Sequence, residues 1–107
     1  MTETVMLCPA DDVLENEIKK VALPDGHAIA LYRVGDTIYA TDDLCTHGDA
    51  SLSEEGIQTG TSVECTFHFG TFDITTGAPT GMPCEVPLKT YPVRVVDGNV
   101  LIEVLDE

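Results

Sequence analysis

The sequence contains few basic residues. Five lysines and arginines stand against 19 aspartates and glutamates, which gives a formal net charge of −14. Proteins that bind nucleic acid need a basic surface for the phosphates, so we expect no nucleic-acid partner, and an anionic membrane surface is disfavoured for the same reason. The acidity either keeps the protein soluble or forms a docking surface for basic patches on partner proteins, where it would accelerate encounter.

Long apolar segments are also missing. No run approaches the roughly 18 consecutive apolar residues that a membrane-spanning helix needs. The first nine residues include the acidic Glu3 and lack the basic region of a signal peptide. The length of 107 residues fits one domain, residues 1–107, and a hydrophobic content of 43% is typical of a globular protein. We therefore expect a cytoplasmic protein without a membrane segment.

Cysteine is scarce as well, with four residues in the chain. Two disulfides are disfavoured in a reducing cytoplasm. Cys8 and Cys84 stand alone in the sequence, and we expect them to be small buried hydrophobic residues. The spacing of the four cysteines does not match that of ferredoxins whose cluster is held by cysteine alone.

The hydrophobic pattern indicates an all-β chain. Turn signals at 24–26, Gly35-Asp36 and Asp97-Gly98 separate apolar or alternating segments. We expect one helical turn within residues 10–17, mostly loop at 42–60, and irregular structure at the proline-rich segment 78–87. The expected strands are 5–7, 18–23, 28–34, 37–41, 62–65, 71–74, 91–95 and 100–104.

Two short motifs carry the chemistry of this chain, Cys45-Thr-His47 and Cys65-Thr-Phe-His68, with 17 residues between His47 and Cys65. Two thiolates and two imidazoles can enclose one inorganic centre. A [2Fe–2S] cluster with two cysteines on one iron and two histidines on the other is of the Rieske type. A zinc ion accepts the same donors, but zinc modules usually begin with two cysteines a few residues apart.

The mixed ligand set has a physical reason. In an oxidised cluster with two thiolates, the charges of the ferric ions, sulfides and thiolates cancel, and neutral imidazoles add none. With four thiolates the core would already be dianionic. An electron enters a neutral centre more easily, so histidine ligation raises the reduction potential.

The contexts of the two motifs, residues 43–49 and 64–72, resemble the Rieske ferredoxin components of bacterial aromatic-ring-hydroxylating dioxygenase systems. The resemblance implies that Cys45 and Cys65 hold the inner iron and that His47 and His68 hold the outer iron near the surface.

The same resemblance implies an all-β Rieske fold, a sandwich of antiparallel sheets with a small cluster-binding subdomain. Two loops, about 42–50 and 65–70, would form this subdomain, and a proline-rich loop at about 77–87 would cover the cluster. An ordinary surface loop is the alternative for residues 77–87.

The departures from related motifs are informative. High-potential Rieske proteins have two further cysteines that bridge the cluster loops, and Ala50 and Phe67 occupy the matching positions here. They also have a serine and a tyrosine whose hydroxyls donate to sulfur, where this chain has Gly70 and Phe72. Hydrogen bonds to sulfur stabilise the added electron, so we expect a low potential.

The number of histidines limits the function. Only His27, in an expected surface turn, remains after the cluster is assembled. The catalytic subunit of a Rieske oxygenase also needs a mononuclear iron held by two histidines and a carboxylate, so this chain cannot contain that site.

The resemblance therefore implies a monomeric one-electron carrier and not an enzyme. Its electrons would come from a flavin-containing, NAD(P)H-dependent ferredoxin reductase and pass to a terminal Rieske non-haem iron oxygenase in aromatic-compound degradation. The neighbours of the ligands would shape the docking surface, although Phe67 and Phe69 could equally be packing residues; these neighbours are Leu44, Thr46, Phe67 and Phe69.

Two alternatives belong to other classes. One is the small Rieske subunit of an assimilatory nitrite reductase; many such subunits have lost ligands, and the intact set counts against it. The other is a structural zinc-binding interaction module.

Overall fold

The computed structural model describes residues 2–15, 17–23, 26, 28–43, 51–65, 70–81 and 87–105. Within these ranges the strands form three sheets, and every strand pair is antiparallel. The described helices are the single 3₁₀ turn η1 (Ala10–Asp12) and the four-residue helix α1 (Leu52–Glu55). The all-β class and the helical turn after residue 10 are therefore confirmed.

The first sheet joins the two ends of the described chain. Its strands are β1 (Thr2–Pro9), β10 (Val93–Val96) and β11 (Asn99–Leu105), in the order β1–β11–β10. A two-residue turn closes the β10–β11 hairpin, with positive φ at Asp97 (52°) and Gly98 (78°). These are the dihedrals that suit the twist of a tight hairpin, as Asp-Gly predicts.

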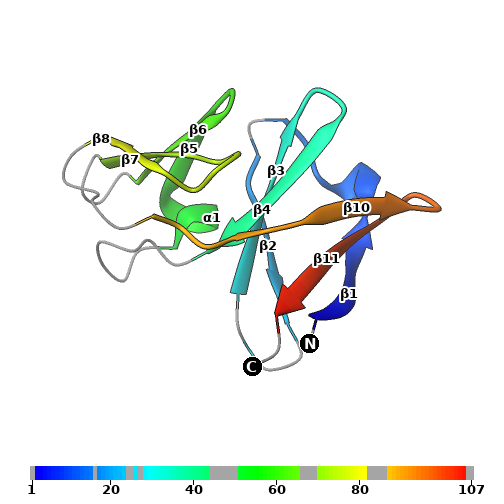
Figure 1. Cartoon of the computed structure of the whole chain (residues 1–107). Coiled ribbons are helices and arrows are strands. Elements are labelled where there is room, and N and C mark those ends of the chain that lie inside the picture. Colours follow the sequence, from blue (N-terminus) through cyan, green and yellow to red (C-terminus); the bar gives the residue numbers. More distant parts are fainter. Residues whose placement is uncertain are drawn as a thin grey trace.

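The second sheet lies in the middle of the molecule (Figure 1). It contains β2 (Lys19–Ala22), β3 (Ala28–Val34), β4 (Thr37–Asp42) and β9 (Thr90–Tyr91) in that order. The third sheet lies beside it, at the left of Figure 1. Its strands are adjacent in sequence: β5 (Gly56–Thr59), β6 (Ser62–Cys65), β7 (Gly70–Asp73) and β8 (Pro79–Gly81).

Strand β3 is buried on both faces, and it separates two hydrophobic cores. Ile29 and Leu31 belong to the first core, with residues of β1 and β11, while Ala30 and Tyr32 belong to the second, with residues of α1, β6 and β7. All four are 0% exposed. Alternate side chains of a strand point to opposite faces, so the apolar run of residues 28–32 in β3 is what a middle layer requires.

The described part of residues 42–60 is more regular than the sequence suggests, because it contains α1 and β5. Strand β5 pairs with β6 from Gly56↔Cys65 to Thr59↔Ser62. Its alternation is the reverse of the usual one: Ile57 is 54% exposed and Gln58 is buried. The expectation of a loop was wrong here because no apolar period marks the strand.

The expectation of irregular structure at 78–87 was also wrong in part. Pro79–Gly81 is the strand β8, which pairs with β7 at the edge of its sheet. Proline is tolerated there because an edge strand needs no hydrogen-bond donor on its outer side. Residues 82–86 lie outside the described residues. In the part of the chain that the structure describes, no helix is long and apolar enough to cross a membrane.

Candidate metal centre

One of the four predicted ligands, Cys65, lies within the described residues. It is the last residue of β6, is 0% exposed and packs in the second core. Cys45, His47 and His68 lie outside the described residues, as do His27 and the predicted docking neighbours Leu44, Thr46, Phe67 and Phe69. The structure therefore describes where each ligand-bearing segment begins and ends.

The segment that carries His68 is held at both ends by a strand ladder. Cys65 pairs with Gly70 across β6 and β7, so residues 66–69 connect two directly opposed positions. On its other side Cys65 pairs with Gly56 of β5. A Cβ at Gly56 would lie 2.4 Å from the carbonyl oxygen of Leu52, so only glycine fits where α1 passes into β5.

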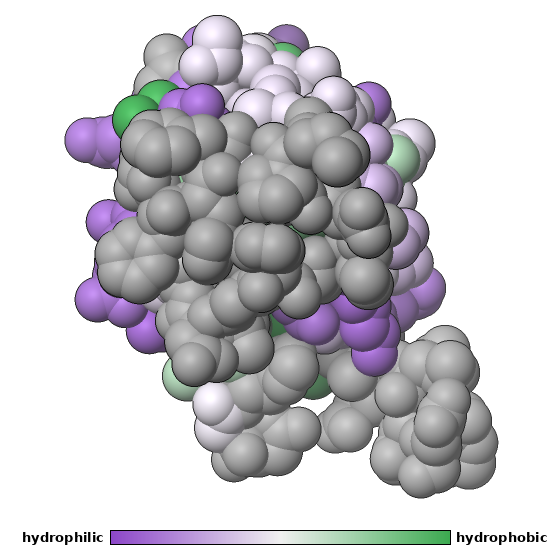
Figure 2. All heavy atoms as spheres, turned by 90° about the vertical axis from the view of Figure 1, so that its left-hand side faces the viewer, coloured by the Kyte–Doolittle hydropathy of each residue, from purple (hydrophilic) through white to green (hydrophobic). Residues whose placement is uncertain are grey.

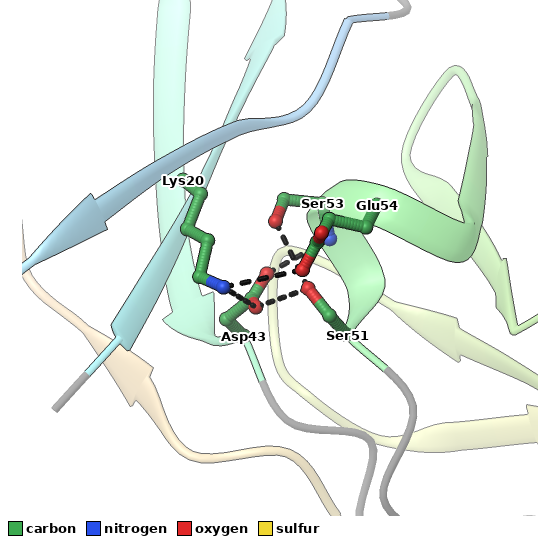
Figure 3. Close-up of polar contacts among 5 residues, drawn as sticks. All are labelled: Lys20, Asp43, Ser51, Ser53 and Glu54. Atoms are coloured by element: carbon green, nitrogen blue, oxygen red, sulfur yellow. Dashed lines mark hydrogen bonds and ion pairs between the residues drawn. The ribbon is translucent and has the colours of Figure 1, made fainter.

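The segment that carries Cys45 and His47, residues 44–50, is closed by Asp43 (Figure 3). The Leu52 N–H donates to the carbonyl oxygen of Asp43 at 2.7 Å. The Ser51 hydroxyl donates to one carboxylate oxygen of Asp43 at 2.5 Å, and the Ser53 N–H donates to the other at 2.8 Å. The end of β4 and the start of α1 are thus joined directly.

A third segment returns to the same core. Leu88, which follows residues 82–86, is 3% exposed in the second core, and its N–H donates to the Gly77 carbonyl at 2.8 Å. Gly77 has φ 79°, and a Cβ there would lie 2.1 Å from the carbonyl oxygen of Leu88. The glycine is required both by its backbone conformation and by this close approach.

The second core is therefore a common base for the three segments 44–50, 66–69 and 82–86. Leu52, Cys65 and Leu88 lie at the ends of these segments and are all members of this core. The buried Cys65 thiol suits an inner sulfur ligand, and thiolate donors select iron–sulfur clusters or zinc. This arrangement fits a centre close to Cys65, at this end of the third sheet.

Comparison with known proteins distinguishes the two centres. A family model described as Rieske [2Fe-2S] domain matches residues 3–92. The chain belongs to the Rieske [2Fe–2S] domain family. Its cofactor is one Rieske-type [2Fe–2S] cluster, so the alternative of a zinc site is rejected.

Relatives in this family include ferredoxins. The chain is 53% identical to the ferredoxin component of the p-cumate 2,3-dioxygenase system of Pseudomonas putida, over 97% of this chain and 88% of the relative. A ferredoxin structure from Sphingomonas yanoikuyae B1 matches with a TM-score of 0.91 and 44% identity, over 96% of this chain and 100% of that one.

A second solved structure is described as a complex of reduced oxygenase and oxidised ferredoxin in carbazole 1,9a-dioxygenase. The match has a TM-score of 0.86 and 44% identity, over 92% of this chain and 91% of that chain. The predicted Rieske fold is therefore confirmed. A putative nitrite reductase small subunit from Mycobacterium tuberculosis is 21% identical and shares the fold alone.

Sequence reasoning missed Asp43 as a structural part of the site. Its carboxylate accepts hydrogen bonds from Ser51 and Ser53, eight and ten residues away, and no local sequence motif predicts that contact. The available signal is Ser51 before α1, since serine is a preferred residue at a helix N-cap. In the structure that hydroxyl makes no cap bond to its own helix and is directed to Asp43 instead.

Cys8 provides the contrast to Cys65. It is 7% exposed in the first core, as expected for a small buried hydrophobic residue, whereas Cys84 lies outside the described residues. Burial raises the pKa of the Cys8 thiol, with a smaller opposing effect of Lys19 and a further increase from Asp12. A thiol with a raised pKa stays protonated at neutral pH, and Cys8 has no histidine within three residues to form a ligand motif.

We predict that Cys65→Ala removes the cluster and that the matched variant Cys8→Ala keeps it, because Cys65 alone of the two is a predicted ligand. Iron and acid-labile sulfide should fall to below about a tenth of the wild-type content in Cys65→Ala, since a [2Fe–2S] core needs all of its protein ligands. Chemical analysis and the visible absorption spectrum measure this. A full cluster in Cys65→Ala would show that the ligand assignment is wrong.

Proposed function

We propose that this chain carries single electrons from a flavin-containing, NAD(P)H-dependent ferredoxin reductase to a terminal Rieske non-haem iron oxygenase that acts on an aromatic compound. The observation that supports this most strongly is the 53% identity, along nearly the whole chain, to a ferredoxin component of a dioxygenase system. The solved complex of a 44% identical ferredoxin with an oxygenase supports the acceptor side. In this role the chain is a component of an enzyme system and has no catalytic site of its own.

We propose Cys45 and Cys65 as the ligands of one iron and His47 and His68 as the ligands of the other. When bound, the cluster accepts and releases one electron. The chain contributes two anionic and two neutral ligands, and this choice keeps the oxidised centre neutral. Cysteine that is held as thiolate ligands suits a reducing compartment, and a reductase that uses NAD(P)H suits the cytoplasm, where we propose that the protein works as a monomer.

We propose a low reduction potential, because two positions close to the cluster lack a hydroxyl donor. Gly70 is buried and pairs with Cys65, and Phe72 is 0% exposed in the same core as Cys65. Gly70 has no side chain and Phe72 has no hydroxyl, so neither residue can donate a side-chain hydrogen bond to sulfur. The net charge of −14 also opposes the entry of an electron.

We predict a potential near the bottom of the Rieske range, about −150 mV, for the wild-type protein. Phe72→Tyr places a hydroxyl in the second core beside Cys65, and a bond of about 1 kcal/mol to sulfur would raise the potential by roughly 40 mV. Phe72→Leu, which adds no donor, is the control for repacking. Potentiometric titration followed by absorption measures all three.

A wild-type potential above about +100 mV, within the upper part of the Rieske range, would contradict the low-potential assignment. An equal rise in Phe72→Tyr and Phe72→Leu would contradict the explanation by a missing donor.

Two of the five basic side chains, those of Arg33 and Lys20, contact other groups of the chain. The Arg33 guanidinium donates to the carbonyl oxygens of Val13 (2.5 Å) and Ala10 (2.8 Å). The Lys20 ammonium lies 3.2 Å from a Glu54 carboxylate oxygen. The sequence has 19 acidic residues against five basic ones. Figure 2 shows mostly hydrophilic or neutral colours among the described residues on the side where the third sheet lies. The exposed acidic residues in the described ranges include Asp11, Asp12, Glu15, Glu17, Asp36, Glu54 and Asp97.

We predict that reduced protein transfers its electron to the terminal oxygenase of the p-cumate system, and that salt slows this reaction. Raising the ionic strength from about 0.01 M to 0.3 M shortens the Debye length from about 30 Å to below 10 Å, so steering by the acidic surface is lost. The second-order rate constant should fall at least about tenfold in stopped-flow absorption measurements. An uncharged quinone, as the control acceptor, should react at a rate that is insensitive to salt.

The absence of electron transfer to the oxygenase at any salt concentration would contradict the proposed function. Transfer with a rate independent of salt would keep the carrier function and show that the acidity serves solubility alone.

A further inference from the structure

We infer that Asp43 is a positioning residue for the cluster, because its carboxylate and carbonyl oxygens fix the two ends of the segment that carries Cys45 and His47. The inference rests on the proposed ligand set. It goes beyond that set by assigning a role to a buried carboxylate that is not itself a ligand.

Asp43 is anchored to the middle sheet on one side. It follows the last residue of β4, and its N–H donates to the carbonyl oxygen of Ala28 in β3 at 3.1 Å. Asp43 is 3% exposed. A buried carboxylate is costly unless hydrogen-bond donors surround it, so its orientation is determined by its partners.

Those partners come from the start of α1. Ser51 and Ser53 each donate to one carboxylate oxygen, and the carbonyl oxygen accepts the N–H of Leu52. The first turn of a helix has amide N–H groups without partners inside the helix, and a side chain just before the helix normally satisfies them. Here Asp43, at the other end of the seven-residue segment 44–50, takes this role.

The two serine hydroxyls form a chain that leads to the carboxylate. Ser51 Oγ and Ser53 Oγ are 3.1 Å apart. The single hydroxyl proton of Ser51 is directed to Asp43, so Ser53 is the donor to Ser51. The carboxylate therefore orients both serines, and a neutral amide at position 43 could not accept from both sides.

Lys20 adds a cation to this group, as Figure 3 shows. Its ammonium lies 4.0 Å from a carboxylate oxygen of Asp43 and 3.2 Å from one of Glu54. The Lys20 side chain is 46% exposed and that of Glu54 is 65% exposed, so this outer ion pair is screened by solvent. Glu54 therefore serves as a charge control: it carries the same charge and contacts the same lysine, but it does not join the ends of 44–50.

The position of α1 relative to β4 affects the relative placement of the proposed ligands Cys45 and Cys65. Cys45 is two residues beyond Asp43, and Leu52 packs in the same core as Cys65. The bonds of Asp43 therefore set how the base of the first ligand segment lies relative to the second. Side chains that orient metal ligands typically change metal affinity by 10–100-fold when they are replaced.

The test compares iron loss with global stability. Purified wild-type holoprotein and the variants Asp43→Asn, Asp43→Ala and Ser51→Ala are incubated with bathophenanthroline in native buffer, and the rate of iron release is measured. Glu54→Gln is the charge control. Val100→Ala, in the first core on the other side of the middle sheet, is the control for stability. Urea unfolding and the electron paramagnetic resonance spectrum of the reduced protein are recorded for each.

We expect iron release to be at least about tenfold faster in Asp43→Ala and intermediate in Asp43→Asn and Ser51→Ala. Their reduced spectra should be broadened by a spread of cluster geometries. Glu54→Gln and Val100→Ala should release iron within about twofold of the wild-type rate, with wild-type spectra. If Asp43→Ala does not fold, the iron-release rates and spectra of Asp43→Asn and Ser51→Ala are compared with those of the two controls instead.

Release rates and spectra in the Asp43 and Ser51 variants that match those of Val100→Ala would overturn the positioning role. A wild-type protein without a Rieske spectrum would instead overturn the proposed ligand set and function. The two failures are therefore distinguishable.

Discussion

Strand β3 is buried on both faces, and both hydrophobic cores depend on it. Ile29 and Leu31 contribute to the core beneath the sheet of β1, β11 and β10, while Ala30 and Tyr32 contribute to the core beneath α1, β6 and β7. A single hydrogen-bonded strand thus contributes side chains to two cores, one on each of its faces. The first core unites the ends of the described chain, and the second provides the base for the metal centre.

The second core restrains the described residues on either side of the segments that carry the proposed ligands. The described residues that flank segments 66–69, 82–86 and 44–50 are each fixed, by the strand ladder at Cys65 and Gly70, by the close approach of Gly77 to Leu88, and by the carboxylate of Asp43. Sites on loops are accurate when the scaffold restrains the loop ends. The electrostatic effects do not depend on this scaffold. The charges of the ligands set the net charge of the centre, and the exposed carboxylates set the charge of the protein surface.

The sequence predicted the local features of this protein and missed the tertiary ones. Strand β3 was predicted with its observed bounds, 28–34, because its residues are mostly apolar and turn signals flank it on both sides. Strand β5 was missed because its buried residue is Gln58 and its exposed residue is Ile57. The ligand motifs are visible because each places a cysteine and a histidine within three residues of each other, a pattern that can be recognised without the fold. Asp43 was missed because its partners are eight to ten residues away, and their contact requires the fold.

The central claim is that two cysteines and two histidines hold one [2Fe–2S] cluster in this chain. Electron–nuclear double resonance on the dithionite-reduced protein tests it most directly, because it detects nitrogen bound to the paramagnetic centre. The account predicts couplings from two distinct ¹⁴N nuclei, which become ¹⁵N couplings when the histidines alone are labelled with ¹⁵N. A reduced cluster whose spectrum shows no histidine nitrogen would contradict it.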